Sequence, residues 1–68
     1  MNYLKWSQEY SETASQLAAV IEKLKNERRH ARAAHKKELD DKLSLYRQYY
    51  RECTETAALL LERHHHAA

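Results

Sequence analysis

The residues of this sequence most suited to chemistry are basic ones gathered near its centre. Residues 23–37 contain seven lysines or arginines and one glutamate. Arginine offers a fork of N–H donors that fits phosphate oxygens, and lysine adds a flexible point charge. The candidate contacts to an anion or a nucleic acid are Arg28, Arg29, Arg32, Lys36 and Lys37. No aromatic side chain interleaves them, so base stacking is not indicated there. The alternative interpretation is a solvated turn kept soluble by its charge.

Histidine and cysteine are the other reactive types, and their spacing argues against a metal centre. The histidines at 64–66 are consecutive, and neighbours on a helix point about 100° apart, so three rings cannot chelate one ion. His30 and His35 have no cysteine or suitably placed carboxylate nearby. Cys53 lies on an apolar stripe, where a thiol packs as a small hydrophobe. We expect no metal and no cofactor.

Catalytic constellations are not indicated by the sequence. It has no glycine with which to cradle a phosphate, no Ser-His-Asp arrangement, and no pair of carboxylates on its apolar stripes. The ionisable residues fall mostly on what would be outer helical faces. We therefore expect a protein that is not an enzyme.

The elements that carry these residues are predicted to be two helices. Glycine and proline are absent, and apolar residues recur in alternating steps of three and four, as in coiled coils. One stripe comprises Tyr3, Trp6, Tyr10, Thr13, Leu17, Val20 and Leu24, and the other comprises Leu39, Leu43, Tyr46, Tyr50, Cys53, Ala57 and Leu60. We predict an all-α, antiparallel two-helix hairpin forming one domain over 1–68. Its expected parts are a helix over about 3–29, a turn over about 30–34, a helix over about 35–63 and a frayed tail over 64–68.

The two stripes are complementary when one of them is reversed. Trp6 then faces Ala57, and Tyr10 faces Cys53, so large residues oppose small ones as close packing requires. A rival arrangement is one unbroken helix of about 60 residues, roughly 90 Å long, paired with a second chain. Residues 25–38 offer only alanines to such a pairing, which favours the hairpin.

Apolar residues beyond the stripes predict self-association. A 68-residue chain buries only about 60 % of its unfolded surface, so a partner subunit is a natural source of stability. The residues expected to make this contact are Leu4, Ile21, Leu45, Tyr49 and Leu59. Two hairpins would then form a homodimeric four-helix bundle, although another helical protein would also satisfy the pattern. The expected function is interaction or assembly; the alternative is a nucleic-acid-binding regulator using Arg28 to Lys37.

The cellular setting expected from the sequence is the cytoplasm. No stretch approaches the roughly 20 apolar residues of a membrane span, and no signal peptide pattern is present. A single cysteine also fits a reducing compartment.

Overall fold

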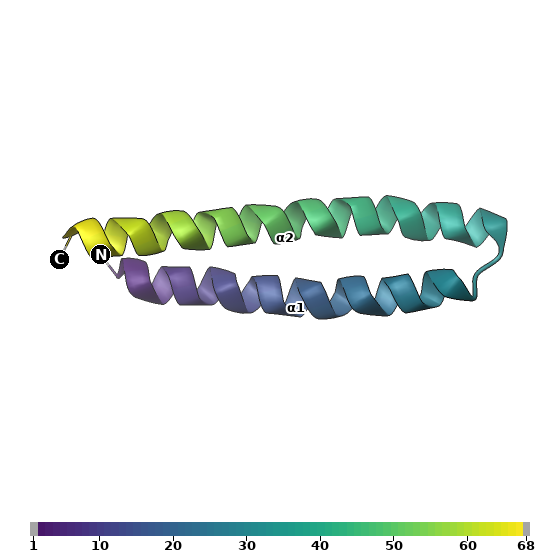
Figure 1. The fold of residues 1–68 in the computed structure, drawn as a ribbon, viewed down its shortest axis with the longest axis horizontal. Helices are drawn as coiled ribbons and strands as arrows, with labels where there is room; N and C mark the ends of the chain where they lie inside the picture. Colours follow the sequence, from purple (N-terminus) through teal and green to yellow (C-terminus); the bar gives the residue numbers. More distant parts are fainter. Residues whose placement is uncertain (1, 68) are drawn as a thin grey trace.

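A computed structural model describes residues 2–67 as two antiparallel α-helices joined by a short turn (Figure 1). Helix α1 spans Tyr3–Arg29 and helix α2 spans Ala33–Ala67. The ends of the two helices remote from the turn lie side by side (Figure 1). The all-α hairpin predicted from the sequence is therefore confirmed, and the rival single long helix is wrong.

Local hydrogen bonds cap both ends of helix α1. The Asn2 side-chain oxygen accepts from the backbone N–H of Lys5 at 2.9 Å, which caps the first turn. At the other end, the N–H of His30 donates to the carbonyl of Glu27 at 3.2 Å. No residue between 2 and 67 has a positive φ, so the chain reverses here without needing glycine.

Helix α2 is longer than expected at both ends. Its first turn is closed by the Lys36 N–H, which donates to the carbonyl of Arg32 at 2.8 Å. Its last residue is Ala67, so the histidine-rich segment predicted to fray is helical as far as the description extends, and residue 68 lies outside it. This segment contains no glycine or proline that would end the helix, and Ala67 favours helix. The imidazole of His66 also lies 3.7 Å from the Glu62 carboxylate one turn earlier.

On α2, four of the seven residues of the predicted stripe are buried, namely Leu39, Leu43, Ala57 and Leu60, whereas Tyr50 of the same stripe is 39 % exposed. The packed seam of α1 differs from the prediction. Ser7 and Ala14 are buried, whereas Trp6 remains 42 % exposed. The Ser7 hydroxyl donates to the backbone carbonyl of Ala57 at 2.9 Å. The expectation that Trp6 fills the core opposite Ala57 is therefore wrong, because the smaller Ser7 makes the buried contact with Ala57.

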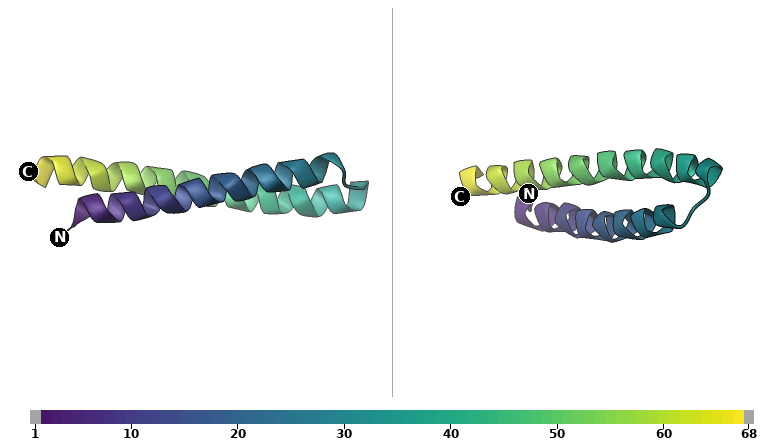
Figure 2. Two further views of the ribbon diagram at one scale, coloured as in Figure 1. Left: turned by 90° about the horizontal axis from the view of Figure 1, so that it is seen from below. Right: turned by 45° about the vertical axis from the view of Figure 1, so that its right-hand side comes forward.

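The folded chain is thin and exposes much surface (Figure 2). Its Cα radius of gyration is 15.6 Å, against about 11 Å for a compact domain of this length. Its accessible surface is 5405 Å², against about 4,500 Å² for a compact monomer of 8.1 kDa. Three leucines of the core, Leu24, Leu39 and Leu43, pack together in the half near the turn. In the half that contains the termini, the buried residues are Leu60 and the smaller Ser7, Ala14 and Ala57, whereas Trp6 and Leu59 stay exposed.

Candidate functional site

Two long sides of the hairpin differ in chemistry. On one side, Trp6 and Tyr10 of α1 line a groove together with Thr56 and Leu60 of α2. On the other side, Ala18 and Glu22 of α1 line a groove together with Arg47 and Tyr50 of α2. In a heptad pattern, residues just before and just after a core position flank it on opposite sides. This rule assigns the other residues that flank the core to one long side of the hairpin or the other.

One side of the hairpin carries large apolar side chains along both helices, with charged residues such as Glu9 and Lys42 between them. Trp6, Thr13 and Val20 each come one residue before a position that faces α2, and they repeat every seven residues. Tyr49 and Thr56 have the same spacing on α2. We call this surface the apolar face, and it consists of Trp6, Tyr10, Thr13, Val20, Leu45, Tyr49, Thr56 and Leu59. It holds six of the nine large hydrophobic side chains that are exposed within residues 2–67.

The residues predicted to self-associate separate into three groups. Leu45, Tyr49 and Leu59 lie on the apolar face, with exposures of 43–47 %. Leu4 lies on the other side of α1, because it follows a core position. Ile21 is half-buried and packs against the core cluster of the hairpin itself.

Sequence reasoning missed Trp6 and Val20 as surface residues because it placed them inside the hairpin. A second stripe that starts at Tyr3 and passes through Ser7, Ala14 and Ile21 fits the same steps of three and four. Choosing this second stripe would have placed Trp6 and Val20 on the surface of the hairpin.

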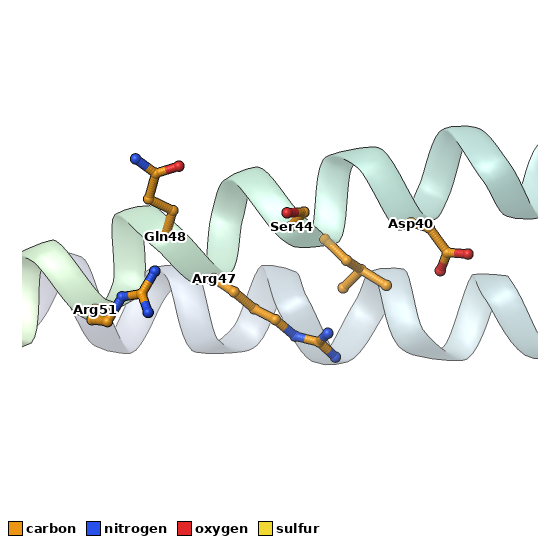
Figure 3. Close-up of a pocket in the computed structure, with 6 residues that line it drawn as sticks. Asp40, Ser44, Arg47, Gln48 and Arg51 are labelled. Atoms are coloured by element: carbon orange, nitrogen blue, oxygen red, sulfur yellow. The ribbon is translucent and has the colours of Figure 1, made fainter.

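The opposite side carries a basic groove. It is lined by Lys25, Arg28 and Arg29 of α1 and by Asp40, Leu43 and Arg47 of α2, and its volume is about 390 Å³. The groove continues along α2 past Ser44, Gln48 and Arg51. Asp40 and Arg47 point toward α1, whereas Gln48 points away from it (Figure 3). We call these lining residues together the basic groove.

An ion pair crosses the basic groove and joins the two helices. Arg28 Nε lies 2.5 Å from Asp40 Oδ1, and Arg28 Nη2 lies 3.4 Å from Asp40 Oδ2. This hydrogen bond and the carboxylate charge raise the pKa of Arg28 above its ordinary value, so the guanidinium stays charged. Both side chains are about half exposed, so water screens the pair.

Only two of the five basic residues singled out from the sequence line the basic groove. Arg28 and Arg29 line the basic groove, whereas Arg32 belongs to the turn and Lys36 and Lys37 to the start of α2. The sequence prediction missed Lys25, Arg47 and Arg51. Their signal was present, because Arg47 and Arg51 are four residues apart and so share a helical face.

The described residues contain neither a metal-binding cluster nor a membrane-spanning helix. Between residues 2 and 67, no three histidine, cysteine, aspartate or glutamate side chains gather closely enough to hold an ion. Cys53 is half-buried and not disulfide-bonded. Neither of the two described helices combines the length and apolarity needed to cross a bilayer.

No protein-family model, curated protein or solved structure matches this chain.

Proposed function

We propose that this chain is a self-associating interaction module, in which a second copy covers the apolar face. The observation that carries the proposal is the concentration of six large exposed hydrophobic side chains on one side of a thin hairpin. A concentration of exposed large apolar side chains on one side is typical of an interaction site in soluble proteins. The module acts by binding rather than by catalysis.

The surface area supports a partner of the same size. The accessible surface is 5405 Å², and it exceeds the value for a compact monomer by about 900 Å². A stable interface buries about 800 Å² on each partner. One long side of the hairpin has Cα extents of 53 × 14 Å, which comes to about 740 Å² before side chains are counted. A partner that covers one long side of the hairpin would therefore bury an area similar to this excess of accessible surface.

The arrangement of the apolar face supports a second copy rather than an unrelated protein. Trp6 and Leu59 lie near the termini, and Val20 and Leu45 lie farther toward the turn. Fourteen residues separate Trp6 from Val20, which is about 21 Å along a helix. In a second copy that runs in the opposite direction, Trp6 and Leu59 lie against Val20 and Leu45 of the first copy. The same contact is then made a second time with the two copies exchanged. Tyr49 lies between the two pairs, near the expected two-fold axis.

The product of this pairing is a four-helix bundle with two-fold symmetry. An isologous contact uses the same patch on both subunits, so a single apolar face is sufficient. The contact between the two copies also covers the half of the hairpin that contains the termini. There the buried residues of the α1–α2 contact include the small Ser7, Ala14 and Ala57. In this proposal, dimerisation supplies the stability that the small core does not.

Two substitutions of the same residue type test the proposal. Leu59 lies on the apolar face, and Leu61, two residues later, lies on the opposite side; their exposures are 47 % and 38 %. Leu59→Glu is expected to raise the dimer Kd at least about 30-fold, because an unpaired charge buried at an interface costs about 2 kcal/mol or more. Leu61→Glu is expected to leave the Kd within about threefold.

Sedimentation velocity over a dilution series measures both Kd values, and circular dichroism confirms that each variant keeps its helices. A wild-type chain that stays monomeric and helical at high micromolar concentration would refute self-association and favour a different helical partner. Equal loss of association in the two variants would refute the assignment of the interface to the apolar face.

A further inference from the structure

We infer that the basic groove binds the phosphate backbone of double-stranded nucleic acid. This inference is independent of the proposed self-association, since the basic groove and the apolar face lie on opposite sides of the hairpin. It also moves the expected contact from the turn, where the sequence placed it, to the side of the helix pair.

The charge balance of the basic groove leaves several cations available. Its lining includes five basic side chains and one carboxylate. Asp40 is paired with Arg28, and Lys25 lies 3.2 Å from Glu22. Within residues 2–67, Arg29, Arg47 and Arg51 have no carboxylate within 4.0 Å. Three guanidinium groups therefore remain free to bind an external anion.

The cations form a row along the long axis of the molecule. Arg47 and Arg51 are one turn apart on α2, and Asp40 marks the level of Arg28 on α1. Eleven residues separate Arg51 from Asp40, so the row is about 17 Å long. A duplex presents a phosphate on each strand every 3.4 Å or so, which places about five on each strand over this length. A straight row on rigid helices suits such a regular array of charges.

The lining chemistry favours a duplex over other polyanions. None of the nine lining residues is aromatic, and the neighbouring groove, which shares Arg47, adds the single ring of Tyr50, so a row of rings on which successive bases of a single strand could stack is missing. Its only large apolar side chain, Leu43, is 3 % exposed, and an interfacial membrane contact needs apolar groups that insert. Arginine's planar fork suits phosphate oxygens.

The basic groove stays open in the proposed dimer. The second copy covers the apolar face, so each subunit presents its basic groove on an outer surface. A dimer would then offer two such rows to one duplex or to two.

The test uses the full-length chain and a fluorescein-labelled 24-base-pair duplex, measured by fluorescence anisotropy at about 50 mM salt. The wild type is expected to bind, with log Kd rising against log salt at about 0.9 per phosphate contacted. Arg47→Gln with Arg51→Gln is expected to weaken binding at least about tenfold and to lower that slope by about 2.

The matched control is Lys5→Gln with Arg63→Gln, which removes the same charge from exposed positions near the termini, away from the basic groove. It is expected to change the Kd less than about threefold. Equal weakening by both pairs would overturn the inference, because net charge alone would then explain binding. No binding at low salt would also overturn it. The inference would also be overturned if the chain bound phosphatidylserine vesicles more tightly than the duplex, or if polyglutamate at equal charge displaced the duplex.

Discussion

Ser7 shows how a single small residue decides which side of α1 faces α2. Ser7 is 6 % exposed, and its hydroxyl donates to the carbonyl of Ala57 at 2.9 Å. A bulky side chain at this position would force the helices apart. Trp6, one residue earlier, is therefore left on the apolar face.

Two substitutions at Ser7 separate its size from its hydrogen bond. Ser7→Ala is expected to lower the free energy of unfolding by only about 1 kcal/mol, because Ala57 is also part of the α2 hydrogen-bond ladder. Ser7→Leu is expected to cost about 1–3 kcal/mol through overpacking. Urea unfolding followed by circular dichroism, at one fixed protein concentration, measures both. A larger loss for Ser7→Ala than for Ser7→Leu would contradict this account.

At the scale of the helix, the hairpin and most of its α2 seam followed from the sequence, whereas the α1 seam did not. On α2, a stripe with steps of three and four includes all four buried residues, Leu39, Leu43, Ala57 and Leu60. On α1, two stripes that share Tyr3, Leu17 and Leu24 both satisfy the periodicity. The sequence prediction chose the more apolar stripe, but close packing against Ala57 selects the smaller residues.

The helix-pair arrangement can be tested by cross-linking. In a Cys53→Ala background, Ser7→Cys with Ala57→Cys is expected to form a disulfide within one chain, because these positions face each other across the hairpin. The oxidised product then migrates as a monomer on a non-reducing denaturing gel. Gln8→Cys with Ala57→Cys is the control; Gln8 is exposed, and this pair is expected to stay reduced. A disulfide-linked dimer from the Ser7 pair would indicate two long helices instead.

The basic groove was only partly predictable from the sequence. Arg28 and Arg29 were visible as part of a charge run, but Arg47 and Arg51 lie far along the chain and approach them only because the hairpin folds back. The same folding pairs Arg28 with Asp40, which the sequence analysis did not anticipate. Charge runs locate cations along the chain, whereas the fold decides which of them share a surface.

At the scale of the whole molecule, the hairpin is a thin rod, 53 × 14 × 13 Å across its Cα atoms, with an apolar side and a basic side. Most large hydrophobic side chains that the small core does not bury lie on one side. This asymmetry is the reason for expecting two copies to pair through their apolar faces and to turn their basic grooves outward.

The most direct test of that pairing follows the emission of Trp6, the only tryptophan in the chain, through a dilution series. Trp6 is 42 % exposed in the single hairpin and would be covered in the dimer. We predict that its emission moves to longer wavelength as the sedimentation-equilibrium mass falls from about 16 kDa to the 8.1 kDa of one chain. Emission that stays constant while the mass halves, or a mass of 8.1 kDa at every concentration, would contradict the account.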